Sequence, residues 1–293
     1  MTRAVLLLAH GTPESLDQMP EYLARVRGGR PPSPELVAEM RSNYGAIGGR
    51  SPLTDITRAQ AAALSTALSG MPVYVGMRNW HPLIADVLAE MAAAGVRELV
   101  ALPMAPQYSS LSVAKYTEAV ESARPAGLDV RFVGSWHEHP GLLDAFAEKL
   151  REARAAATWD RVLFTAHSLP VRVIAQGDPY AEQVAATARG VAMRAGVSEF
   201  GQAYQSAGRT PEPWLGPTLD EAIAAAAAEG ARRILVVPVG FLCDHTEILF
   251  DVDVQAAEVA RRGGVEVGRT ASLNVSPTFI RALADLVRAT TTS

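Results

Sequence analysis

Two histidines occupy matching positions in the two halves of the chain. His10 lies in the phrase LLLAHGTP, and His167 lies in the phrase LFTAHSLP. In each phrase an apolar run, typical of a buried parallel strand, ends at Ala-His and leads into a turn with a proline. Ligands of open α/β sheets bind outside the carboxyl ends of the strands. We therefore expect both histidines to face one cleft, where an imidazole can accept a proton or bind a metal.

Acidic residues follow the last strong strand, in the segment PVGFLCDHTEILFD. A structural interpretation makes Asp244 a helix cap, with Glu247 completing a capping box. In the same way, a lone histidine such as His167 is more often a core or capping residue. Helical spacing supports a second interpretation, because Asp244, Glu247 and Asp251 share one helix face. A His and a Glu from two strand ends can accept protons as a pair or handle a divalent ion transiently, although they are too few for a permanent metal site.

Aromatic and basic residues mark two further segments, GMRNWHPL and QSAGRTPEPWLGP. Trp80 and Trp214 are either hydrophobic anchors or flat aromatic walls of a binding site. Arg78 follows a strand end, where a guanidinium group can bind a carboxylate. The loop over residues 25–30 adds a cluster of three arginines, namely Arg25, Arg27 and Arg30. Such a cluster beside a cleft suits a polyanionic substrate.

Strands and helices that would position these residues alternate from end to end. The apolar patterns predict strands over residues 4–9, 73–76, 98–102, 130–134, 161–166, 202–205 and 233–238. Amphipathic patterns predict helices over residues 84–94, 142–157, 180–195 and 219–229. This alternation predicts an α/β fold of two similar doubly wound, Rossmann-like domains, each a parallel sheet flanked by helices, with the active-site cleft between them. We place the domains at residues 1–137 and 138–275, and we expect a C-terminal helix over 276–290 to pack back on the first.

Composition excludes several classes of protein. At 293 residues with a net charge of −4, the chain lacks the basic balance of a nucleic-acid-binding protein. The single cysteine, Cys243, excludes an internal disulfide and a cysteine-held iron–sulfur cluster, and it fits a cytoplasmic setting. No apolar run reaches the roughly 18 residues of a transmembrane helix, and the N-terminus is typical of a first strand, not a signal peptide. Without heptads or a long apolar surface helix, we expect a monomer.

A series of phrases matches a known family in order and across almost the whole chain. These phrases are HGTPES, YGAIGGRSPL, GMRNWHPLI, FTAHSLP, GDPY, YQSAGRTPEPWLGP and PVGFLCDHTEILFDVDV. On them the chain resembles the ferrochelatases, lyases that insert ferrous iron into a porphyrin in haem biosynthesis. The resemblance implies a chelatase-type fold, a porphyrin and ferrous iron as substrates, and no organic cofactor.

The resemblance also assigns roles to individual residues. His167 matches the family's essential histidine and Glu247 its partner acid, a pair thought to take the pyrrole protons and meet the metal while the macrocycle is distorted. Asp251 falls on an acidic track that leads to the site, and Gln255 stands where an acid often continues that track. Contacts to the porphyrin are expected at six further positions, namely Arg27, Tyr44, Ser51, Arg78, Tyr108 and Trp214.

Two branches of the family differ in substrate. The short polar segment over residues 27–48 resembles the soluble bacterial branch, which acts on coproporphyrin III and lacks an apolar lip for membrane docking. The arginine in GMRNW instead resembles the protoporphyrin IX branch, so that substrate stays open. A chelatase for another metal or tetrapyrrole, and a non-catalytic haem- or porphyrin-binding protein, also stay open. His10 replaces a tyrosine that is usual in the soluble branch, and we hypothesise that it is an axial ligand opposite His167.

Overall fold

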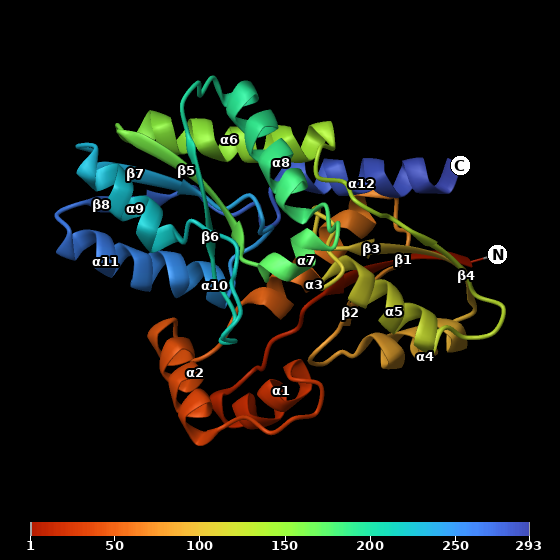
Figure 1. The fold of residues 1–293 in the computed structure, drawn as a ribbon. Helices are drawn as coiled ribbons and strands as arrows, with labels where there is room; N and C mark the ends of the chain where they lie inside the picture. Colours follow the sequence, from red (N-terminus) through yellow and green to blue (C-terminus); the bar gives the residue numbers. More distant parts are fainter. Residues whose placement is uncertain (1, 293) are drawn as a thin grey trace.

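A computed structural model describes residues 2–292 and shows two four-stranded parallel sheets (Figure 1). The first sheet has the order β2-β1-β3-β4 and is built from β1 (Thr2–Ala9), β2 (Val73–Met77), β3 (Val96–Pro103) and β4 (Asp129–Phe132). The second has the order β6-β5-β7-β8 and is built from β5 (Arg161–His167), β6 (Gly201–Gln205), β7 (Arg233–Val237) and β8 (Glu266–Arg269). The two orders are equivalent, which confirms the predicted pair of similarly wound parallel sheets.

Strand β1 shows why the sheets are buried on both faces. Leu6, Leu7 and Leu8 have no exposed surface. Because successive side chains of a strand point to opposite faces, Leu7 joins one hydrophobic cluster while Leu6 and Leu8 join another. Helices must therefore cover both faces, and parallel sheets require exactly such crossover helices between their strands.

Helices connect the strands and cover the sheets. The first half contains α1 (Met19–Val26), α2 (Pro34–Ala46), α3 (Leu53–Ala67), α4 (Ile84–Ala93) and α5 (Val113–Ala123), with a short 3₁₀ turn at Leu16–Gln18. The second half contains α6 (Pro140–Ala156), α7 (Val171–Ala175), α8 (Tyr180–Ala195), α9 (Leu219–Ala228), α10 (Thr246–Leu249), a π-helical stretch at Asp251–Ala256, α11 (Ala257–Arg262) and α12 (Pro277–Thr292). In the described part of the chain, none of the helices has the length and apolarity needed to cross a membrane.

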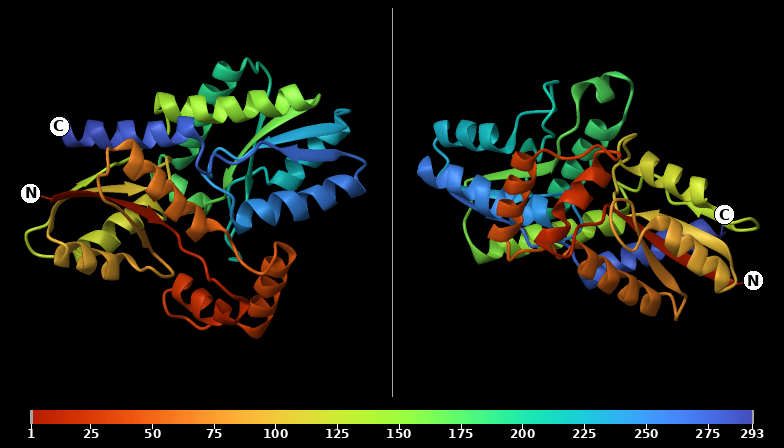
Figure 2. Two further views of the ribbon diagram at one scale, coloured as in Figure 1. Left: turned by 180° about the vertical axis from the view of Figure 1, so that it is seen from behind. Right: turned by 90° about the horizontal axis from the view of Figure 1, so that it is seen from below.

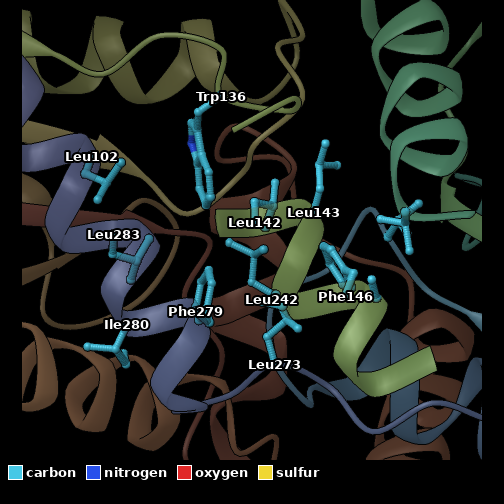
Figure 3. Packing of buried hydrophobic residues seen from close by; sticks show 14 of the residues in the cluster. Leu102, Trp136, Leu142, Leu143, Phe146, Leu242, Leu273, Phe279, Ile280 and Leu283 are labelled. Atoms are coloured by element: carbon cyan, nitrogen blue, oxygen red, sulfur yellow. The ribbon is translucent and has the colours of Figure 1, made fainter. Parts of the chain in front are cut away.

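One hydrophobic cluster joins the two sheets. It contains Leu7 of the first sheet, Phe164 of the second, and residues of α6 and α12. In this cluster Trp136 stacks on Phe279 of α12, with ring centroids 6.4 Å apart (Figure 3). Helix α12 packs against α3 and β3 and also lies beside α6, so it contacts both halves. The division of the chain at residues 137–138 stays a prediction, since the core is continuous across it.

Two features differ from the sequence-based expectations. Strand β8 was not predicted, because Glu266–Arg269 is a short, half-exposed edge strand whose side chains carry no apolar run. The helices predicted from amphipathic patterns also do not include α1 and α2, which follow β1. These helices stand away from both sheets (Figure 2) and pack on each other through Met19, Tyr22 and Tyr44. Their position lets them cover the carboxyl ends of the strands from outside.

Candidate active site

A cavity of about 800 Å³ lies where the carboxyl ends of the two sheets meet. His10 enters it from the end of β1 and His167 from the end of β5, while Arg78 follows β2 and Gln205 ends β6. The cavity is within the size range of small-molecule sites, and its lining is more apolar than polar. The structure therefore confirms that both histidines of the repeated phrase face one cleft between the sheets.

His167 presents one ring nitrogen to Glu247. Its Nδ1 lies 2.5 Å from the carbonyl oxygen of Ser168, so Nδ1 carries the proton and donates it to this carbonyl. The other ring nitrogen, Nε2, lies 3.7 Å from Glu247 Oε2. The hydroxyl of Tyr180 donates to the backbone oxygen of His167 and fixes the strand end. This geometry directs Nε2 toward the carboxylate and the cavity.

A second histidine flanks the same carboxylate. His245 Nδ1 lies 3.0 Å from the carbonyl oxygen of Cys243, and its Nε2 lies 4.0 Å from Glu247 Oε2. Burial would raise the pKa of Glu247, but the positive potential of His167 and His245 outweighs it and holds this pKa below its ordinary value. Sequence reasoning passed over His245, although the phrase DHTE contains it. Only the turn before α10 directs its ring into the cavity.

Asp244 does not form the expected capping box. The N-cap of α10 is His245, and no side chain caps the helix. Asp244 instead accepts hydrogen bonds from Ser272 and Asn274 and pairs with Arg269 at 3.0 Å. The prediction that Asp244 shares the active face with Glu247 was wrong, because these partners turn its side chain away from the cavity.

Asp251 and Gln255 continue the cavity wall beyond Glu247. The chain follows a π-helical path here, with the Gln255 N–H donating to the carbonyl of Phe250 at 2.8 Å. The hydroxyl of Ser206 donates to Asp251. Burial raises the pKa of Asp251 to about 6, and the neighbouring Glu247 carboxylate acts in the same direction. The predicted stripe therefore exists, but it runs through Glu247, Asp251 and Gln255.

Replacing Asp251 by asparagine should remove a pH-dependent loss of stability. In the wild type, the stabilisation of the folded state that comes from the raised pKa of Asp251 is fully present below pH 3.8. This stabilisation is lost as the pH rises through about 6. The free energy of unfolding should therefore fall, relative to Asp251→Asn, by on the order of 1–2 kcal/mol across this interval, allowing for solvent screening. Urea unfolding of both proteins at about pH 4.5 and about pH 7.5 measures the change. An equal difference at both pH values would contradict the assignment.

His10 is held in a different environment from His167. Its Nε2 lies 3.2 Å from the hydroxyl of Tyr22, and the side-chain amide nitrogen of Asn79 lies 3.2 Å from its ring nitrogens. Burial, together with the nearby Arg78 guanidinium, lowers the pKa of His10 to about 4. His10 is therefore neutral at physiological pH and keeps a lone pair.

The remaining predicted porphyrin contacts divide into two groups. Tyr44, Arg78 and Trp214 line the cavity. Arg27, Ser51 and Tyr108 do not belong to its lining: Arg27 is exposed after α1, Ser51 is buried before α3, and the Tyr108 backbone is bonded to Gln183. Their role in porphyrin binding stays a prediction that the geometry does not support.

The predicted arginine cluster also lies outside the cavity. Arg25 pairs with Glu21 and covers Trp80 at 5.7 Å, and Arg30 donates to the carbonyl of Arg27. Trp80 itself is buried against Tyr22, as the hydrophobic-anchor interpretation predicted. The cations that do line the cavity are Arg78 and Arg209. Arg209 was not predicted as a site residue, and its position depends on the fold of the loop after β6.

Comparison with known proteins identifies one family, by a family model and by similar proteins. A family model described as Ferrochelatase matches residues 2–291. The chain belongs to the ferrochelatase family. A ferrochelatase from Deinococcus radiodurans is 43% identical over 97% of this chain and 94% of that protein. A coproporphyrin III ferrochelatase from Geobacillus sp. is 36% identical over 97% of this chain and 96% of that protein.

The fold of this ferrochelatase also resembles that of a solved chelatase. SirB from Bacillus subtilis superposes with a TM-score of 0.63 over 99% of this chain and 96% of that one, at 13% identity. At that identity the likeness concerns the fold alone, and it supports the chelatase-type architecture. Members of the ferrochelatase family are enzymes that insert a metal into a porphyrin, so the cavity between the sheets is the candidate site of that reaction.

Proposed function

We propose that this ferrochelatase inserts ferrous iron into coproporphyrin III. The observation that carries the choice of porphyrin is α2, which borders the cavity where an apolar membrane-docking lip would lie. Only Tyr44 of this helix is fully buried, and its large apolar side chains, Leu36, Val37 and Met40, pack against the α1 cluster, so α2 exposes no large apolar side chain to solvent. Relatives named coproporphyrin III ferrochelatase, 35–37% identical to the chain, support the proposal. The relatives with the higher identities carry the name ferrochelatase without a stated porphyrin.

In the proposed reaction, His167 and Glu247 remove the two pyrrole protons and meet the incoming iron. His167 Nε2 and the Glu247 carboxylate face each other at 3.7 Å, at the wall of the cavity. A neutral imidazole and an ionised carboxylate are both competent proton acceptors near neutral pH.

Iron is a substrate that passes through, and among residues 2–292 no group of three or more His, Cys, Asp or Glu side chains is arranged to hold a resident ion. We further propose that the enzyme needs no organic cofactor and acts as a cytoplasmic monomer.

An anaerobic assay with ferrous iron tests the substrate assignment. The value of kcat/KM for coproporphyrin III should exceed that for protoporphyrin IX. The reverse order would replace the proposal by the protoporphyrin alternative, which the arginine at position 78 favours. Repeated turnover, in contrast to a single stoichiometric burst, would separate catalysis from a non-catalytic porphyrin-binding role.

We also propose that His10 ligates the iron of the bound product from the first sheet. Its ring is neutral because its pKa is lowered to about 4, so a nitrogen lone pair is available to a metal. His10→Ala should therefore shift the Soret band and change the iron spin state of the enzyme–iron porphyrin complex. The exposed His81 is not part of the cavity lining, and His81→Ala is the matched control. Unchanged spectra in His10→Ala would exclude ligation.

A further inference from the structure

An ion pair crosses the opening of the cavity. Arg209, in the loop between β6 and α9, pairs with Glu39 of α2, and both residues line the cavity. The Arg209 side chain is 66% exposed and that of Glu39 34% exposed, which places the pair at the mouth. In Figure 1 this loop descends from the second sheet toward α2. The pair thus joins the two halves across the entrance.

The loop that carries Arg209 is held in place on its own side of the cavity. A Cβ on Gly208 would lie 2.5 Å from the ring of Trp214, so the backbone crosses directly over that indole. The Trp214 indole N–H donates to the Thr210 hydroxyl at 3.0 Å, and Leu215 N–H donates to the carbonyl of Leu169 at 2.8 Å. Arg209 therefore does not need Glu39 to stay at the mouth.

We propose that Arg209 is a receptor for a carboxylate on the rim of the porphyrin, and that Glu39 is the resting partner which this carboxylate displaces. The inference rests on the proposed function, because it requires a planar substrate with acidic side chains on its edge. A guanidinium group binds carboxylates in bidentate fashion, and Glu39 presents to Arg209 the same chemical group as a propionate. Arg78, which also lines the cavity, is bonded to the carbonyl of Leu111 and lies over Tyr116, and no carboxylate pairs with it among the described residues. The two arginines therefore offer two cationic positions in the cavity. Arg209 already pairs with a carboxylate of the protein, that of Glu39.

Exchange of the Arg209 partner is physically easy. Ion pairs between exposed side chains are weak because water screens them and both side chains lose freedom. A carboxylate tethered to a macrocycle that is already bound reaches Arg209 at high effective concentration. Glu39 then competes with the substrate for Arg209. Arg209 therefore strengthens substrate binding, and Glu39 weakens it.

Porphyrin binding without iron tests this opposition. Fluorescence titrations would compare coproporphyrin III with its tetramethyl ester, both delivered in the same mild detergent. Glu39→Gln should lower the Kd for the tetra-acid about three- to fivefold, and Arg209→Gln should raise it by a similar factor. Neither variant should change the Kd for the ester. The pair Arg172–Glu212 joins α7 to the same loop and lies outside the cavity lining, so Arg172→Gln is the matched control and should leave both values unchanged.

The alternative outcomes are distinct. If the ion pair were only a latch between the two halves, Glu39→Gln and Arg209→Gln would shift the Kd in the same direction, and this would overturn the proposal. Equal effects on the tetra-acid and the ester would also overturn it, because no carboxylate would then be recognised. A wild-type protein that binds neither porphyrin would instead contradict the proposed function itself.

Discussion

His167→Ala should lower the rate of iron insertion by about 10²- to 10⁴-fold, the usual contribution of a positioned proton acceptor. The variant removes the imidazole whose Nε2 faces Glu247 at 3.7 Å. Porphyrin binding should persist, because the cavity walls come from both sheets and from α2. The loss should therefore fall on kcat and leave the porphyrin Kd nearly unchanged.

Stopped assays under anaerobic conditions measure kcat, and fluorescence titration measures the porphyrin Kd. The exposed His81 provides the matched control, since it lies outside the cavity lining. A His167→Ala enzyme with full turnover would remove His167 from the proposed mechanism. A variant that no longer binds porphyrin would show a structural role at the end of β5, which far-UV circular dichroism would report.

Glu247→Gln should produce a loss of similar size, about 10²- to 10⁴-fold in kcat. Glutamine keeps the volume of the side chain, so the cavity retains its shape while the carboxylate is lost. Burial alone would raise the pKa of Glu247, but His167 and His245 keep it below its ordinary value. The carboxylate is therefore ionised throughout the neutral range. Protonation of Glu247 should not limit activity as the pH falls from neutrality toward the ordinary pKa of a glutamate side chain.

Glu258→Gln is the control for this variant. Glu258 lies on the same stretch of chain, pairs with Arg261 and Arg262, and is absent from the cavity lining. Activity of Glu258→Gln should match the wild type. Equal losses in Glu247→Gln and Glu258→Gln would indicate a general effect of altered charge and would contradict a specific role for Glu247.

Local sequence patterns were sufficient to predict the position of a site residue where its side-chain direction follows from a strand or helix. The apolar run of β1 ends at His10 and that of β5 ends at His167, and parallel strands bring these ends to one edge. The sequence therefore predicted the cleft and the proximity of His167 to Glu247. The edge strand β8 escaped prediction, because a half-exposed strand of four residues needs no continuous apolar run.

Side chains in loops and at helix ends were predictable only in part. Asp244 had the spacing of a helix cap, yet Ser272 and Asn274 bind it from a later segment. The arginines after α1 had the composition of an anion site, but the chain turns them outward, and Arg209 reaches the mouth from the other half. In both cases the deciding partner is distant in sequence, and no local pattern encodes it.

The amino-acid sequence by itself determined the two wound parallel sheets, the strand ends that carry His10 and His167, and the membership of the family. These features depend on strand burial and on phrases read within short windows. Only the tertiary structure decided which ionisable side chains face the cavity: His245 and Arg209 do, whereas Asp244 and Arg27 do not. The physical reason is that a loop side chain points wherever its hydrogen bonds and ion pairs are satisfied, and here those partners come from the opposite half or from a later segment of the chain.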